Sequence, residues 1–426
     1  MPKGRLMLIV GAAVVLIIVG IIFYVGRKPS IGPGARLVFW DAVDSNIVWK
    51  PMIEEFNKTF SNIQISYVKK DPKTFEDEFI KALARGEGPD IFSFYNTWLP
   101  KYVDLVRPLS LDFQNQWGFE PRQFSSIYPK VVSDDFLSSQ GIYALPLYVD
   151  TLALYYNRDF FDSRGIPNPP TTWDEFVKTA QTFTKKDERG NIIRSGAALG
   201  KANNIDKATD ILSILMIQKG NNIIDRSTKS VLIGKDEKAK EALNFYVSFA
   251  NPQSLNYSWD LPGVNSIDAF SQGKSVMMIN YAEARSLIRS KSPTLNFLIS
   301  TLPQFDPDLR KDYADYYGLS VTRRSRAPDQ AWNFITFAAS QAGANAYLSL
   351  SGRPPARRDF LSLKFDEELA VFARQVLSAK SWYQPDQAKI VKIFTDMIES
   401  VVGRRSTADK AIDLAAQELE EITASR

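Results

Sequence analysis

The 426-residue chain contains no cysteine and no histidine. Without cysteine it can form no disulfide, thiolate nucleophile, iron–sulfur cluster or lipid-modified N-terminal cysteine. Without histidine it can form no Ser-His-Asp triad and no histidine-ligated zinc site. These two absences exclude most familiar hydrolase and metalloenzyme chemistry. They leave the redox compartment open, because proteins on either side of a membrane can lack cysteine.

Nucleotide-binding and calcium-binding signatures are also missing from the sequence. No Gly-rich phosphate loop follows a predicted strand, and the pattern of an EF-hand loop does not occur. Gly86-Glu87-Gly88 is better explained as the end of a helix. We therefore expect no cofactor, no structural metal and no catalytic residues. Carboxylates are plentiful, but their spacing alone does not identify the acid and nucleophile of a glycosidase.

Length and composition predict a large folded protein. Hydrophobic residues make up 45% of the chain and charged residues 23%, which is typical of soluble globular domains. The length is two to three times that of an ordinary domain, so we expect at least one large core and a second one beside it. We expect a monomer.

The net charge of +4 comes entirely from the N-terminus. The first thirty residues hold four basic residues and no acidic one, and subtracting these four from the 52 basic residues leaves 48, equal to the 48 acidic residues. A balanced body offers no basic field for a phosphate backbone. We therefore expect no nucleic-acid partner.

A membrane segment is predicted at residues 6–25, which carry no charge and are rich in Leu, Ile and Val. Twenty helical residues span a hydrocarbon core of roughly 30 Å. A cleaved secretory signal is the alternative, but no convincing small-x-small cleavage site follows the apolar run. We favour an uncleaved anchor and a Pro/Gly-containing tether over residues 1–30, with a single pass through the cell membrane. Basic pairs flank both ends, so the positive-inside bias is marginal.

Beyond the tether, strand and helix patterns alternate. Strands are predicted at 37–40, 63–68 and 91–94, with helices between them, which implies a parallel α/β sheet. Thr172 to Glu175 has the spacing of a capping box, so a helix should begin there. Later strands are predicted at 275–279, 296–299 and 318–321, and helices dominate the remainder.

Aromatic and polar residues gather at the predicted strand ends. Ligands of open α/β sheets bind beyond such ends, and flat rings beside carboxylates and amides suit a sugar, whose CH groups stack while its hydroxyls form hydrogen bonds. Any one of these rings could instead be core packing, and only their joint placement predicts a cleft. The residues concerned are Trp40, Asn96, Trp98, Tyr148, Asp150, Tyr281, Glu283, Tyr316 and Tyr317.

The body of the chain resembles the family 1 extracellular solute-binding proteins of bacterial ABC importers, the maltose- and sugar-binding type. The resemblance covers nearly all of residues 37–426 in the order of the family. The stretches that carry it are Gly86-Glu87-Gly88-Pro89-Asp90-Ile91, Gly141-Ile142-Tyr143-Ala144-Leu145-Pro146-Leu147-Tyr148-Val149-Asp150, Leu154-Tyr155-Tyr156-Asn157-Arg158-Asp159, Pro170-Thr171-Thr172-Trp173-Asp174-Glu175-Phe176, Ala269 to Ile279 and Ala331-Trp332-Asn333-Phe334-Ile335.

This resemblance implies a two-lobed α/β fold, the type II periplasmic-binding-protein fold, with a ligand trapped between the lobes. It places lobe 1 at about 36–147 and 301–345 and lobe 2 at about 148–300 and 346–426, all within a solute-binding domain of residues 31–426. The chain would cross between the lobes near 147–150, 295–301 and 345–352. Carried over residue by residue, the cleft falls on Trp40, Asp44, Asn96, Trp98, Asp150 and Tyr281 to Glu283. The maltose-type proteins have a tryptophan at the position of Glu283, so maltose itself is doubtful.

The expected function is therefore extracytoplasmic capture of an oligosaccharide and its delivery to the permease subunits of an ABC importer, by a protein that is not an enzyme. Two alternatives stay open. One is a binding protein for another small solute, notably ferric iron, for which Tyr316 and Tyr317 offer hard oxygen ligands. The other is a glycoside-active enzyme built on the same lobes.

Overall fold

The computed structural model describes residues 34–363 and 365–424. The predicted anchor and tether, residues 1–30, lie outside the described residues. Within these two ranges, no helix combines the length and the apolar character needed to cross a membrane.

The first lobe is built on a mixed sheet with strand order β2-β1-β3-β15-β4, and β7 pairs with β15. The first three strands are parallel, as the alternating pattern predicts, whereas β15 runs antiparallel to β3 and brings a distant segment into the sheet. The strands are β1 (Ala35–Asp41), β2 (Ile63–Lys69), β3 (Ile91–Tyr95), β4 (Val106–Arg107), β7 (Leu145–Pro146) and β15 (Tyr317–Thr322), and a separate hairpin joins β5 (Leu137–Ser138) to β6 (Gly141–Ile142).

Helices cover the first sheet because each presents one apolar face. In α2, Val48, Trp49, Met52 and Phe56 are buried, and the Ser45 side chain caps its first turn. Helix α3 ends at Gly86, which takes the left-handed backbone conformation (φ 76°) that glycine adopts at little cost. The helices of this lobe are α2 (Asn46–Thr59), α3 (Phe75–Arg85), α4 (Leu99–Tyr102), α5 (Phe124–Ile127), α6 (Lys130–Phe136), α13 (Pro328–Ala339) and α14 (Gln341–Ser351).

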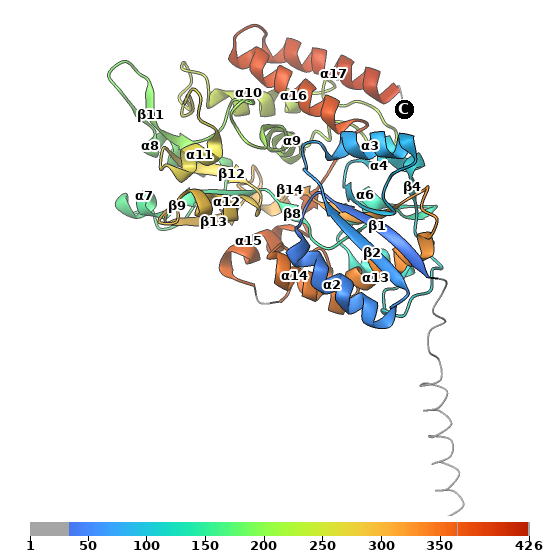
Figure 1. Ribbon diagram of the computed structural model, residues 1–426. Helices are drawn as coiled ribbons and strands as arrows, with labels where there is room; N and C mark the ends of the chain where they lie inside the picture. The colour runs from blue at the N-terminus through green and yellow to red at the C-terminus, as the bar shows by residue number, and fades with distance from the viewer. Residues whose placement is uncertain (1–33, 364, 425–426) are drawn as a thin grey trace, which may run out of the picture.

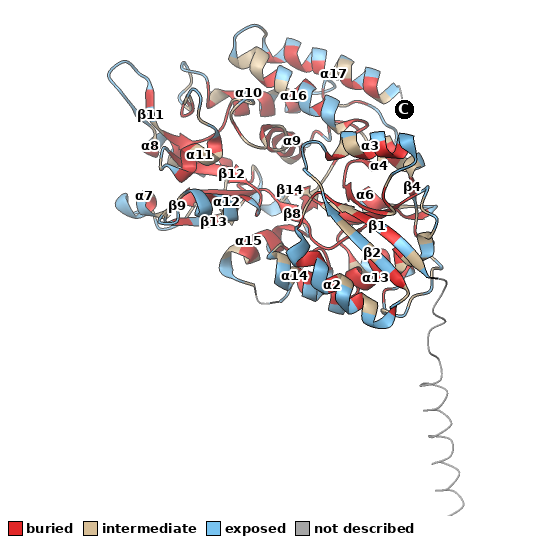
Figure 2. Ribbon diagram, in the orientation of Figure 1, coloured by how far each residue is buried: buried red, intermediate tan, exposed pale blue. Residues whose placement is uncertain are grey.

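The second lobe has a five-stranded sheet in the order β10-β11-β12-β9-β13. Its central strands β9 and β12 are buried along their whole length, because helices cover both faces (Figures 1 and 2). The strands are β9 (Ala153–Asn157), β10 (Lys185–Lys186), β11 (Ile192–Ala197), β12 (Ser275–Asn280) and β13 (Phe297–Thr301).

The helices of the second lobe include the predicted capping box. The Thr172 side chain accepts from the Glu175 N–H, and the Glu175 carboxylate accepts from the Thr172 N–H in return. In the last helix, apolar residues recur at spacings of three, four and three, and all four are buried: Ile412, Ala415, Leu419 and Ile422. The helices are α7 (Arg158–Ser163), α8 (Trp173–Phe183), α9 (Ala208–Lys219), α10 (Glu237–Ser248), α11 (Ser266–Ser271), α12 (Ala284–Lys291), α15 (Glu367–Gln375), α16 (Gln387–Val402) and α17 (Ala408–Ala424).

A small sheet joins the lobes, with strand order β16-β14-β8. Its strands β8 (Asp150–Thr151), β14 (Asp312–Asp315) and β16 (Ala379–Lys380) lie where the chain passes from one lobe to the other. We refer to these three strands as the hinge sheet.

Two separate hydrophobic cores confirm the two-lobed architecture. The first core takes buried residues from Leu37 to Val149 and from Ala314 to Ala356, together with Val376 and Ala379. The second takes buried residues from Leu152 to Tyr313, then Val371 and Phe372, and those from Trp382 to Ile422. Leu302 and Tyr313 pack in the second core, whereas Tyr347 and Ala356 pack in the first.

Candidate functional site

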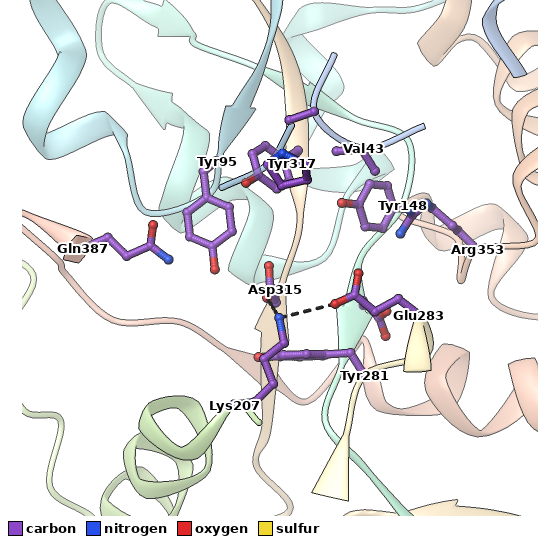
Figure 3. Close-up of a pocket in the computed structure, with 13 residues that line it drawn as sticks. Val43, Tyr95, Tyr148, Lys207, Tyr281, Glu283, Asp315, Tyr317, Arg353 and Gln387 are labelled. Carbon is purple, nitrogen blue, oxygen red and sulfur yellow. Dashed lines mark ion pairs between the residues drawn. The ribbon is translucent and has the colours of Figure 1, made fainter. Parts of the chain in front are cut away.

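A cavity of about 260 Å³ lies between the lobes, beside the hinge sheet (Figure 3). Lobe 1 contributes loops at the ends of β1, β2 and β3 and the start of β15, and lobe 2 contributes the start of α9 and the loop after β12. Both lobes therefore supply walls, which is the arrangement of an interlobe cleft. The lining residues are Ala42, Val43, Pro72, Tyr95, Tyr148, Asp150, Lys207, Tyr281, Glu283, Asp315, Tyr317, Arg353 and Gln387.

Asp150 ties the hinge sheet to lobe 2. Its Oδ1 accepts hydrogen bonds from the N–H of Thr151 (2.8 Å) and of Ala282 (2.9 Å), which lies in the loop after β12. Burial raises the pKa of Asp150 to about 7, although the Ala282 N–H opposes this rise. Near neutral pH the carboxyl group can therefore either donate or accept a hydrogen bond.

Lys207 compensates the acidic side of the cleft. Its backbone is left-handed (φ 60°) at the start of α9, and its Nζ lies 3.3 Å from Glu283 Oε1 and 3.7 Å from Asp315 Oδ2. The ammonium group also lies over the Tyr281 ring, 5.1 Å from its centroid. Burial alone would lower the pKa of Lys207, but Asp315 and Glu283 outweigh it and hold the pKa above its ordinary value.

Tyr281 is held rigidly at the end of β12. Its hydroxyl donates to Asp210 Oδ2 (2.9 Å), and its carbonyl oxygen accepts from the Tyr155 hydroxyl (2.6 Å). Burial, together with the negative charge of Asp315, raises the pKa of Asp210 to about 7. With its hydroxyl and its backbone carbonyl both held in this way, the Tyr281 side chain has little conformational entropy to lose when a ligand binds.

Arg353 provides the cationic part of the lobe 1 wall. Its Nε donates to Asp44 Oδ1 (3.0 Å), and its guanidinium lies 4.5 Å from the centroid of the Tyr148 ring. Asp44 also accepts from the Tyr347 hydroxyl (2.5 Å). Asp44 therefore lies behind the cavity wall and orients Arg353, which faces the cavity.

The structure brings together five of the ten residues predicted from the sequence. Tyr148, Asp150, Tyr281, Glu283 and Tyr317 line the cavity, and Asp44 adjoins it through Arg353. Trp40 is half-buried at the end of β1 and lies outside the lining, with the Lys70 ammonium 3.8 Å from its ring centroid.

The other three predicted residues lie away from this cavity. Trp98 is buried and stacks on Phe75, with ring centroids 5.8 Å apart, so its ring belongs to the lobe 1 core. The Tyr316 hydroxyl donates to Asp135 (2.7 Å), and Asn96 donates to the same carboxylate (3.1 Å). Tyr316 and Tyr317 are neighbours at the start of a strand, so their side chains point in opposite directions. They therefore do not converge on one metal ion.

Sequence reasoning missed several cleft residues. Tyr95 ends β3 and Asp315 ends β14, so the strand-end rule that selected Asn96 could have found both. Lys207 and Arg353 lie in loops without a recognisable pattern. Only the fold brings them to the cavity.

These features define a two-lobed α/β fold with a cavity between the lobes at the hinge. The model of the bacterial extracellular solute-binding protein family matches residues 43–345, which is more than half of the chain. The chain belongs to this family. Its members and structural neighbours are binding proteins rather than enzymes.

Individual relatives are distant in sequence. A protein of Brucella abortus (strain 2308), described only as a binding protein, is 22% identical over 389 residues, which cover 87% of this chain and 90% of the relative. The mannitol-binding protein of Pseudomonas aeruginosa is 26% identical over 270 residues, covering 59% of this chain and 58% of the relative.

Solved structures share the fold over nearly the whole chain. A cyclo/maltodextrin-binding protein in complex with maltotetraose has a TM-score of 0.75 at 19% identity and covers 92% of this chain and 98% of its own. A solute-binding protein of Thermotoga lettingae bound to α-D-tagatose has a TM-score of 0.73 at 20% identity. The match covers 92% of this chain and 100% of the Thermotoga chain. The two-lobed α/β solute-binding fold is thereby confirmed.

Proposed function

We propose that the interlobe cleft binds a carbohydrate or sugar alcohol, which the protein releases unchanged to an ABC importer. One observation carries this proposal. Four tyrosines and three carboxylates from both lobes face a single cavity at the hinge. Such a lining offers rings for the CH faces of a sugar and acceptors for its hydroxyls.

The protonation of the cleft also fits a polyhydroxylated ligand. A carboxyl group with a pKa of about 7, as burial gives Asp150, can accept from one hydroxyl or donate to another. Glu283 and Asp315 keep acceptor oxygens beside Lys207, which can itself donate to a ligand hydroxyl. The ligands named for the mannitol-binding relative and for the maltodextrin-binding neighbour support the same ligand class.

The binding domain would work outside the cytoplasm, held at the cell membrane by residues 1–30. The uncharged run at 6–25 supports an anchor, and the family supports an extracytoplasmic site and a permease as partner. Membrane extraction tests the anchor. The full chain should stay with membranes in high salt and dissolve in detergent, whereas a chain cleaved after the apolar run would appear in the soluble fraction.

A thermal-shift screen tests the ligand class. A solute that binds only the native state raises the melting temperature with its concentration. We expect a concentration-dependent rise with at least one sugar or sugar alcohol, and none with amino acids, polyamines or ferric citrate. A rise with one of the latter solutes alone would contradict the proposal.

The two alternative functions make different predictions. Ferric binding through the tyrosine pair should be abolished by both Tyr316→Phe and Tyr317→Phe, although the Tyr316 hydroxyl is directed at Asp135. A glycoside-active enzyme should release a chromogenic aglycone at a rate that Asp150→Asn or Glu283→Gln abolishes. Under the proposed function neither behaviour is expected.

A further inference from the structure

Two ion pairs join the lobes outside the hinge sheet. In the first, the Nζ of Lys101, in α4 of lobe 1, lies 3.1 Å from Oδ2 of Asp386, which caps the first turn of α16 in lobe 2. Gln387, the residue after Asp386, lines the interlobe cleft. The Lys101–Asp386 pair therefore lies at the edge of the cleft, where opening of the lobes would separate the two side chains.

The second ion pair has the opposite polarity. Arg226, in the loop after α9 of lobe 2, donates from Nη2 to Asp135 Oδ1 (2.9 Å) and from Nη1 to the Asp134 carbonyl oxygen (2.8 Å), both in α6 of lobe 1. Ser381, which follows the hinge strand β16, donates to the same Asp135 oxygen (2.5 Å). Each lobe thus supplies one cation and one anion. Complementary charges of this kind fix the relative placement of two surfaces.

Both ion pairs are largely shielded from water. The exposed fraction is 19% for the Lys101 side chain and 10% for Asp386, and it is 34% for Arg226 and 1% for Asp135. Exposed ion pairs contribute little to stability, whereas loss of one partner of a buried pair leaves a charge without compensation. Burial raises the pKa of Asp135, and the Arg226 guanidinium opposes this rise. The lobe 1 carboxylate therefore depends on a cation from lobe 2.

The lobe 1 member of each ion pair also has partners within its own lobe. Lys101 Nζ lies 2.8 Å from Glu76 Oε1, and Asp135 accepts from the Tyr316 hydroxyl (2.7 Å) and from Asn96 Nδ2 (3.1 Å). Neither charge would lose all of its partners if the lobes separated, so the cost of breaking the interlobe pairs is reduced. The contacts between the lobes can therefore form and break reversibly.

Apolar packing contributes little to the contact between the lobes beside these ion pairs. A cavity of about 290 Å³ lies there, bordered by Leu99 and Val103 of lobe 1, by Trp382 of lobe 2, and by Asp135 and Arg226. Side chains that border a cavity lack the close contacts of a packed interface. The charged side chains, and not apolar packing, therefore bring the lobes together at this place.

We propose that the Lys101–Asp386 and Arg226–Asp135 pairs form an interlobe latch, which favours the closed arrangement of the lobes and slows the release of a solute from the cleft. The four side chains are positioning residues. They lie outside the lining of the hinge cleft and act by holding its two walls together. The effect on the lobes stands by itself, whereas the effect on solute release rests on the proposed function.

The distance between two spin labels, one on each lobe, measures the latch without any solute. The chain contains no cysteine, so Lys73→Cys and Ser290→Cys provide two unique labelling sites. Lys73 is exposed beside Pro72 of the cleft wall in lobe 1, and Ser290 is exposed on α12 of lobe 2. Pulsed electron spin resonance gives the populations of short and long distances. We expect wild type to populate the short distance of the closed arrangement measurably.

Variants of both ion pairs should shift these populations. Lys101→Met and Asp386→Ser each remove one charge, and serine keeps an N-cap acceptor for α16. Each should raise the ratio of long to short distances about threefold or more, with little further change in the double variant, because both lose the same pair. Arg226→Met tests the second pair in the same way, even if a variant of the first pair fails to fold. The matched control is Lys219→Met, since Lys219 is 23% exposed and pairs with Glu241 within lobe 2.

Release of the sugar found by the thermal-shift screen is the second readout. Lys101→Met should speed dissociation about threefold or more in stopped-flow dilution, with an association rate close to that of wild type. If no sugar binds, the proposed function fails while the label distances still test the latch.

The latch is overturned if wild type shows no short-distance population, or if the latch variants keep the wild-type distances or favour the short one. It is also overturned if the two single effects add in full, or if Lys219→Met shifts the ratio equally. An unchanged dissociation rate alongside shifted distances would overturn the role of the latch in solute release.

Discussion

Asp150 and Asp315 lie directly opposite each other on the antiparallel strands β8 and β14, at the floor of the interlobe cleft. Carboxylates at facing positions of a sheet repel each other, and burial raises the pKa of both. Lys207, 3.7 Å from Asp315, supplies the counter-charge from lobe 2. The negative charge of this pair at the hinge is therefore compensated by a residue of lobe 2, Lys207.

We expect stability to fall as the pH rises from about 4 to about 7. The native chain retains the Asp150 proton up to its pKa of about 7, whereas the unfolded chain releases it near 3.9. Native Asp150 therefore binds more protons in this window, and the free energy of unfolding decreases with pH by up to a few kcal/mol. Asp150→Asn should flatten the profile, measured by urea unfolding at several pH values.

The free energy of unfolding of Asp150→Asn should still decrease to some extent between about pH 4 and pH 7, because Asp210 also has a pKa raised to about 7. Asp150→Asn with Asp210→Asn should remove most of it. If the free energy of unfolding of the wild type instead rises steadily between about pH 4 and pH 7, these carboxyl groups do not dominate the pH dependence of stability.

Replacing Lys207 by Met should destabilise the protein by roughly 1–3 kcal/mol near pH 8. The variant leaves Asp315 without its counter-charge, and the deficit should shrink near pH 5, where the carboxyl group takes up a proton more readily. Lys392→Met is the matched control, since Lys392 is 76% exposed and forms a surface pair within α16. Equal effects of both variants, independent of pH, would contradict the assigned role.

Trp98→Ala should act on stability and not on ligand contact. Trp98 is buried among the rings of Phe75, Phe94 and Tyr102, and truncation of such a side chain costs about 3–5 kcal/mol. Urea unfolding should show this loss, and the milder Trp98→Phe should keep wild-type affinity. A large loss of affinity in a well-folded Trp98→Phe protein would return Trp98 to the binding site.

The sequence predicted the secondary structure well because the local signals were strong. The apolar spacing of α17 and the capping box of α8 are each complete within a few residues. The cleft was harder, because a tyrosine at a strand end looks the same whether it faces the cleft, as Tyr317 does, or Asp135, as Tyr316 does. Orientation depends on strand pairing, and β15 reaches its neighbour β3 across more than two hundred residues. Lys207 and Arg353 come to the cleft only through such long-range pairing.

Ligand binding should close the lobes. The walls of the cleft belong to two separate cores joined by the short hinge sheet, where changes at a few backbone angles move whole lobes. Solution scattering should give a smaller radius of gyration with a saturating sugar identified by the thermal-shift screen. An unchanged radius, with binding verified in the same sample, would indicate a rigid site.

The most direct test of the account is calorimetric titration of that sugar into wild type, Tyr317→Ala and Tyr281→Ala, which remove one ring from each lobe. Tyr316→Phe, which changes the neighbouring ring outside the cleft, is the matched control. We predict that both cleft variants bind about tenfold or more weakly, for a loss of roughly 1.4 kcal/mol or more, while Tyr316→Phe binds as wild type does. Wild-type affinity in both cleft variants, or a loss confined to Tyr316→Phe, would contradict a carbohydrate site between the lobes.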